Sequence, residues 1–198
     1  MNGYGSHIPV LEVVCDHLRA RTALEYGAGN FSTPWLLQHI ERLTTVELKG
    51  EWLDKVRTGL SAEAQARWRA IPTNDELSLF LEPGLVTKCD VALVDGGDYR
   101  ARAAIVQVLA LVGAAKAIVA HDSERLEFCY DRVWLPDGWV CVRVEGDMPW
   151  TSVFTADDVL VKMLSSKWRC TVCHSIHEIR RLPYPAIPAW KGEETPSP

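Results

Sequence analysis

The chain has 198 residues, of which 47% are hydrophobic and 24% charged, values that fit one globular domain and exclude a disordered or fibrous protein. Its net charge of -5, without any run of lysine and arginine, makes nucleic acid an unexpected partner. No apolar stretch is long enough to cross a bilayer, and the first residues lack the features of a secretory signal, so we expect a cytoplasmic protein with no membrane partner.

The hydrophobic pattern predicts helices and strands that alternate up to about residue 120. In chain order, they are a helix over 9–19, a strand over 22–26, a helix over 34–40, a strand over 43–48, a helix over 51–68 with a break near Gly59, strands over 77–81 and 89–94, a helix over 100–111 and a strand over 117–120. We expect Ser32 or Thr33 to cap the second of these helices, with Pro34 at its first position. Segments 139–144 and 151–154 favour an antiparallel hairpin. We therefore predict an α/β fold: a Rossmann-like, doubly wound, mostly parallel sheet with an antiparallel hairpin at its C-terminal end.

The domain organisation follows from composition. We expect residues 1–181 to form a single domain, because no linker interrupts them. Residues 182–198 hold five prolines in 17 residues, which predicts an extended tail.

The segment from 23 to 33 reads ALEYGAGNFST and predicts a strand, a glycine turn and the start of a helix. Gly27 and Gly29 permit a close approach of the backbone to a ligand. A nicotinamide fingerprint needs a third glycine, where this chain has Ser32. Glu25, at the end of the strand, is expected to repel a pyrophosphate and to attract a cation. S-adenosylmethionine carries a sulfonium and an ammonium but no phosphate, so it suits this turn better than NAD.

Carboxylates follow several of the predicted strands. Glu47 lies 18 residues after Gly29, a spacing that suits a carboxylate accepting hydrogen bonds from ribose hydroxyls. Glu25, Asp95 and Asp122 also stand at predicted strand ends. Ligands of open α/β sheets bind beyond the carboxyl ends of the strands. The sequence therefore predicts one acidic crevice at this edge of the sheet.

Two further segments carry a resemblance to a family. Residues 91–100 read VALVDGGDYR and residues 116–122 read KAIVAHD. With the glycine turn and Glu47, they cover about residues 20–125 and resemble the class I S-adenosylmethionine-dependent methyltransferases, most closely the small-molecule, catechol-type branch. That branch has histidine where this chain has Asp98.

The resemblance implies a cofactor site. The residues it implies as binding S-adenosylmethionine are Glu25, Tyr26, Gly27, Ala28, Gly29, Ser32, Thr33, Glu47, Leu48, Asp95 and Gly96. Asp95 would lie beside the transferable methyl, and Glu82 would form part of the adenine wall. Ser6 and His7 either fold over the cofactor or only begin the first helix.

The catalytic candidates are Asp95, His121 and Asp122. Methyl transfer needs alignment of the reacting atoms and removal of a proton, and the ordinary pKa of histidine suits His121 for that task. The alternative is that His121 only forms hydrogen bonds at the end of its strand and removes no proton. In the catechol-type branch, acids at the positions of Asp95 and Asp122 hold Mg²⁺; the next residue here is Ser123 rather than asparagine. The alternative for Asp122 is a helix cap.

Cys170, Cys173, His174 and His177 form a C-x-x-C-H pattern with a further histidine. Haem attachment and zinc binding are the two specific interpretations. We expect neither, because no secretory signal accompanies the first and the four groups are too close together for the second. All six cysteines are expected to be free thiols.

The expected function is transfer of a methyl group from S-adenosylmethionine to an oxygen or nitrogen of a small molecule. The alternative is a non-catalytic, S-adenosylmethionine-binding protein that acts as a sensor or partner subunit. The lack of the family's histidine at position 98, where this chain has Asp98, favours this alternative. The segment after the fourth predicted strand reads Asp95-Gly-Gly-Asp, without the prolines that nucleic-acid amine methylases carry there. Association as a homodimer is left open.

Overall fold

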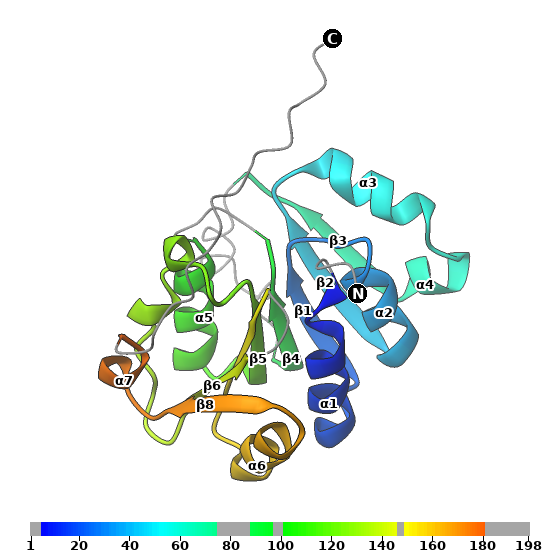
Figure 1. The fold of residues 1–198 in the computed structure, drawn as a ribbon. Coiled ribbons are helices and arrows are strands. Elements are labelled where there is room, and N and C mark those ends of the chain that lie inside the picture. Colours follow the sequence, from blue (N-terminus) through cyan, green and yellow to red (C-terminus); the bar gives the residue numbers. More distant parts are fainter. Residues whose placement is uncertain (1–4, 75–87, 97–100, 146–148, 181–198) are drawn as a thin grey trace.

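The computed structural model describes residues 5–74, 88–96, 101–145 and 149–180 (Figure 1). The strand predicted over 77–81, Glu82, Asp98 and the tail lie outside the described residues. The strands are β1 (Thr22–Tyr26), β2 (Arg42–Glu47), β3 (Trp68–Pro72), β4 (Cys89–Val94), β5 (Ala115–His121), β6 (Val140–Glu145), β7 (Thr151–Thr155) and β8 (Arg169–Cys173). The helices are α1 (Ile8–Leu18), α2 (Ser32–His39), α3 (Gly50–Thr58), α4 (Ala62–Ala66), α5 (Ala101–Leu111), α6 (Asp158–Lys167) and α7 (Ile176–Arg180).

The described strands form one sheet in the order β3-β2-β1-β4-β5-β7-β6-β8. The pairs among β3, β2, β1, β4 and β5 are parallel, and β7, β6 and β8 are antiparallel to their neighbours. The predicted fold class is confirmed. Strand order reverses between β1 and β4, and such a switch point opens a crevice at the carboxyl ends of the strands.

Helices cover both faces of the sheet (Figure 1). One core lies under α1, α2, α3 and α6, with fully buried Leu11, Leu36 and Leu160. The other lies under α5 and α7, with Ile105, Leu109 and Ile118. Both faces of β4 and β5 are thus shut from water, which explains why these strands read as continuous apolar runs. None of the described helices combines the length and apolarity needed to cross a membrane.

The region predicted as one helix over 51–68 folds differently. α3 ends at Thr58, and Ser61 then caps α4 by accepting a hydrogen bond from the amide of Ala64 at 3.2 Å. Trp68 already belongs to β3, which pairs with β2 and is the third strand of the parallel sheet. The prediction of a helix up to Trp68 was wrong because Trp68 pairs with β2 as part of the sheet. Its indole Nε1 donates to the Thr45 hydroxyl at 2.8 Å.

Two other details differ from the sequence interpretation. Ser32 and Thr33 do not cap α2, whose N-cap is Phe31 and has no side-chain cap. Both hydroxyls donate instead to Glu25. The C-terminal region contains α6 and β8 in addition to the predicted hairpin.

Candidate active site

The glycine turn after β1 packs directly against the loop after β4. Gly27 has φ of +90°, a left-handed conformation that is open mainly to glycine. A Cβ on Gly27 would overlap the backbone of Gly96, and a Cβ on Gly96 would overlap that of Gly27. The amides of Asp95 and Gly96 both donate to the carbonyl of Tyr26, at 2.9 and 2.7 Å. The two loops therefore form one closely fitted floor at the switch point.

Glu25 holds this turn from inside. Its side chain is fully buried. Oε1 accepts from the hydroxyl of Ser32 at 2.6 Å, and Oε2 accepts from the hydroxyls of Thr33 and Thr45 at 2.8 and 2.7 Å. The carboxylate thus ties the turn to β2. This geometry differs from the sequence interpretation, in which the carboxylate faced the cofactor's positive charge directly.

Burial raises the pKa of Glu25 to about 7, while the three hydroxyl hydrogen bonds act in the opposite direction. The folded state therefore holds the proton more tightly than the unfolded chain, whose carboxyl titrates near 4.5. Between these pH values, the contribution of Glu25 to the free energy of unfolding falls as pH rises, by about 1.4 kcal/mol for each unit of pKa difference.

We predict that Glu25→Gln removes this pH dependence, because the amide does not titrate. Urea unfolding of wild type and variant from pH 4 to 8 measures it: the stability advantage of wild type should shrink as pH rises through the window. Glu63→Gln, at an exposed position on α4, should keep the wild-type slope. Parallel curves for wild type and Glu25→Gln would contradict the buried, proton-binding carboxyl.

Glu47 ends β2 at the outer side of the same turn. Its Oε2 accepts the amide of Ala28 and its Oε1 the amide of Lys49, both at 2.9 Å. Trp52 of α3 donates its Nε1 to the carbonyl of Ala28 at 2.5 Å. The carboxylate is half-buried and keeps acceptor capacity, because each of its oxygens can take a second hydrogen bond. Its contact with a ribose stays a prediction.

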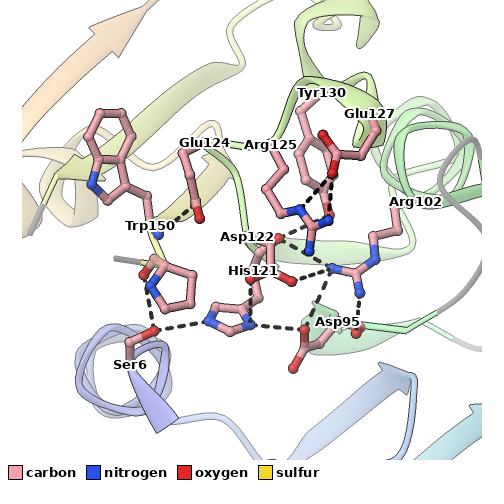
Figure 2. A network of polar contacts seen from close by, with 11 residues as sticks. Ser6, Asp95, Arg102, His121, Asp122, Glu124, Arg125, Glu127, Tyr130 and Trp150 are labelled. Carbon is pink, nitrogen blue, oxygen red and sulfur yellow. Dashed lines mark hydrogen bonds and ion pairs between the residues drawn. The ribbon is translucent and has the colours of Figure 1, made fainter. Parts of the chain in front are cut away.

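His121 lies between a hydroxyl and a carboxylate (Figure 2). Its Nδ1 is 2.9 Å from Asp95 Oδ1, and its Nε2 is 2.9 Å from Ser6 Oγ. The Ser6 hydroxyl donates its single hydrogen to the carbonyl of Pro149 at 3.0 Å, so it accepts from Nε2. Both ring nitrogens can then donate, an arrangement that favours the imidazolium form of His121. Burial alone would lower the pKa of His121, but the hydrogen bond and charge of Asp95 outweigh it and raise the pKa.

Arg102, in the first turn of α5, reaches both Asp95 and Asp122 (Figure 2). Its Nη1 lies 3.6 Å from Asp95 Oδ1 and 3.3 Å from Asp122 Oδ2, and its Nη2 donates to the Asp95 carbonyl at 2.6 Å. The side chain is 9% exposed and packs over the ring of Phe128 at 4.0 Å. Arg102 thus neutralises part of the acidic crevice. The carboxylate of Asp122 serves this ion pair rather than a helix cap.

These residues do not fit Mg²⁺, which requires near-octahedral oxygen coordination. A guanidinium already lies against Asp95 and Asp122. The side chain of Ser123 is buried and offers one hydroxyl where an amide oxygen was expected. The other donors nearby are nitrogens of His7 and His121, which suit transition metals rather than magnesium. The Mg²⁺ interpretation of Asp95 and Asp122 therefore finds no support in the geometry.

We predict that Mg²⁺ has no effect on this protein. Titration of Mg²⁺ into the purified protein should give no binding heat at millimolar concentration and no shift in melting temperature. Dialysis against EDTA should leave any turnover unchanged. Saturable Mg²⁺ binding, or turnover that EDTA removes and Mg²⁺ restores, would show that a metal displaces Arg102.

A cavity of about 730 Å³ opens where these strand ends meet, in the size class of small-molecule sites. The predicted residues that line it are Ala28, Gly29, Ser32, Asp95, His121 and Asp122. The predicted residues that do not line it are Glu25, Tyr26, Gly27, Thr33, Glu47, Leu48 and Gly96. The turn and the three catalytic candidates therefore share one cavity, whereas Glu25 and Gly27 act from behind its wall.

Sequence reasoning missed Arg102, Trp52 and Arg125, which also line the cavity. A signal for Arg102 existed: it is the only charged residue of α5, ARAAIVQVLAL, and it follows Asp95 by seven positions. A lone arginine in an apolar helix needs an anion within reach. Trp52 and Arg125 had no comparable signal.

The cysteine-histidine segment does not form a metal site among the described residues. Cys170 and Cys173 lie on β8, where Cys173 is buried opposite Cys141 of β6. His174 and His177 are exposed. All six cysteines are free, as predicted.

No family model matches the sequence, and no curated protein matches it. Solved structures do match the fold. A Klebsiella pneumoniae protein provisionally assigned as an O-methyltransferase is 16% identical, with 74% of this chain and 77% of that one covered and a TM-score of 0.59. An O-methyltransferase from Bacillus cereus in complex with SAH is 18% identical over 74% and 79%, with a TM-score of 0.57.

A third match is the O-methyltransferase TomG of tomaymycin synthesis from Streptomyces achromogenes, in complex with SAM. It is 15% identical over 77% of this chain and 86% of that one, with a TM-score of 0.54. At these identities the likeness concerns the fold. The chain therefore has the fold of the class I S-adenosylmethionine-dependent methyltransferases, as its motifs predicted.

Proposed function

We propose that the protein transfers a methyl group from S-adenosylmethionine to an oxygen or nitrogen of a small molecule. The observation that carries the proposal is the shared cavity. It joins the glycine turn, at Ala28 and Gly29, to Asp95 and His121 on the next two strands of the sheet. A cofactor on the turn thus presents its methyl to the carboxylate of Asp95 and the ring of His121.

The cofactor assignment rests on charge and on the turn. Asp95 keeps a carboxylate at the cavity wall, because the hydrogen bond from His121 and the nearby charges lower its pKa even though burial opposes them. This carboxylate offers a negative charge to the sulfonium, although Arg102 and His121 offset part of that charge. Glu47 offers acceptors for ribose hydroxyls at the other side of the turn. The solved structures with SAM and SAH have the same fold.

The acceptor is proposed to be a small molecule rather than a nucleic acid. The net charge of -5 and the absence of an Asn/Asp-Pro-Pro motif after β4 support this choice. Homodimer formation is a separate proposal, and size-exclusion chromatography tests it.

Isothermal calorimetry with S-adenosylmethionine, S-adenosylhomocysteine and NAD tests the cofactor assignment. We expect saturable binding of both sulfur compounds and none of NAD. Methyl transfer is then sought with radiolabelled cofactor and a panel of phenols, alcohols and amines. Binding of NAD alone would overturn the proposal, and tight cofactor binding with no transfer to any acceptor would favour the non-catalytic alternative.

A further inference from the structure

His7 lines the cavity, and its imidazole takes part in none of the hydrogen bonds described above. It immediately precedes α1, is 1% exposed, and packs edge-on against His121 with ring centroids 4.5 Å apart. Neither of its ring nitrogens has a hydrogen-bond partner among the described residues. An unpartnered buried polar group destabilises the fold that contains it. Such a group facing a cavity indicates a partner that arrives with a ligand.

His7 and His121 differ in protonation. The contacts of His121 with Asp95 and Ser6 favour its imidazolium form, because both ring nitrogens face an oxygen that can accept. Burial lowers the pKa of His7 to about 4; the positive neighbour His121 adds to this effect, and Asp95 opposes it. At neutral pH His7 is therefore a neutral imidazole with an available lone pair. One cavity wall thus holds a hydrogen-bond acceptor, His7, beside a hydrogen-bond donor, His121.

A hydroxyl group complements this pair. One ring nitrogen each of His7 and His121 and one oxygen of Asp95 all lie within 4.8 Å of one another. A ligand oxygen at about 2.8 Å from two such nitrogens spans that separation. It donates its own hydrogen to the free nitrogen of His7 and faces the ring of His121. An amine with two N–H bonds would instead prefer two acceptors.

We propose that His7 is the general base of the reaction, and that the acceptor is a hydroxyl on a flat, largely apolar molecule. The second part rests on Phe31, Trp52 and Pro149, which contribute apolar surface beside the charged and polar residues of the cavity. The inference rests on the methyltransferase function proposed above and deepens it.

The step balances as follows. The hydroxyl oxygen attacks the methyl carbon of S-adenosylmethionine and forms the O–C bond. The C–S bond breaks, and its electron pair stays on sulfur as the thioether of S-adenosylhomocysteine. The hydroxyl proton passes to the free ring nitrogen of His7 and then to water. A weakly basic imidazole suffices, because the proton becomes strongly acidic as the oxygen gains the methyl group.

Replacement of His7 by phenylalanine tests this role. Phenylalanine keeps the ring and removes both unpartnered nitrogens, so the variant should fold with unchanged or higher stability. Methyl transfer is measured at pH 8 with two probes, unsubstituted phenol, which is neutral, and 4-nitrophenol, which is ionised. We expect His7→Phe to lose about 10²–10³-fold in kcat with phenol and to retain most of the rate with 4-nitrophenolate, which carries no proton to remove.

His17→Gln, on the helix that His7 precedes, is the matched control. It breaks the 2.9 Å contact with Asp157 and should leave both rates unchanged. Equal losses of His7→Phe with both probes, or no loss with either, would overturn the assignment of His7 as base. A wild-type protein that binds S-adenosylmethionine but methylates neither phenol would overturn the acceptor class. Failure of wild type to bind the cofactor at all would instead overturn the proposed function.

Discussion

Alanine at Gly96 is expected to eliminate S-adenosylmethionine binding and to lower the free energy of unfolding by about 3 kcal/mol or more. The new Cβ would overlap the Cα of Gly27, which is backbone and has no side chain to rotate away. Relief requires the loops after β1 and β4 to separate, and these loops form the floor of the cavity. Gly27→Ala should be at least as damaging, because its φ of +90° adds backbone strain. Calorimetry and urea unfolding measure both effects.

Gly50→Ala provides the matched control. Its Cβ would meet nothing closer than Pro72, at 3.9 Å, and it lies at the start of α3 outside the cavity. We expect cofactor binding to be unchanged and stability to stay within about 1 kcal/mol of wild type. If Gly96→Ala bound the cofactor as Gly50→Ala does, the close contact of the two loops would not matter for the site.

Asp95→Asn is expected to reduce turnover by about 10²–10⁴-fold while the protein remains folded. The amide has the shape of the carboxylate but not its charge. His121 then loses the partner that raises its pKa, and Arg102 loses one of its two carboxylates. Both changes alter the electrostatics beside the transferred methyl. Initial rates with radiolabelled cofactor, together with thermal melting, separate loss of turnover from loss of fold.

Asp90→Asn changes an aspartate at the opposite end of the same strand, β4. Asp90 pairs with Lys116 at 2.7 Å and accepts the amides of Arg21 and Thr22, so this variant should lose stability but keep its turnover. Unchanged turnover in Asp95→Asn, or equal losses of turnover in both variants, would remove Asp95 from the catalytic residues.

Much of the fold could be predicted because the central strands have a clear sequence pattern. β4 and β5 are covered on both faces, so CDVALV and AKAIVAH read as short apolar runs. Parallel strands place their carboxyl ends at one edge, and this rule, together with the family resemblance, predicted that Asp95, His121 and Asp122 lie close together. Gly27 and Gly29 predicted the turn for a different reason: the backbone there lies where a side chain would not fit.

The features that the sequence did not predict depend on contacts between residues that are distant in sequence. Trp68 entered β3 because Thr45 lies opposite it on the neighbouring strand, which no local pattern shows. The role of Glu25 reversed, from facing a ligand to holding the turn, because Ser32, Thr33 and Thr45 surround it in the fold. The ion pairs of Arg102 likewise arise only when α5 packs beside the ends of β4 and β5.

The central claim is that one cavity at the switch point holds S-adenosylmethionine with its sulfur beside Asp95 and His121. A crystal structure of the complex with S-adenosylhomocysteine tests it most directly. We predict that the amino-acid part lies against residues 28–32, that the ribose hydroxyls reach Glu47, and that the sulfur faces Asp95. Density for the ligand at any other surface, or a ligand whose sulfur points away from Asp95 and His121, would contradict the account.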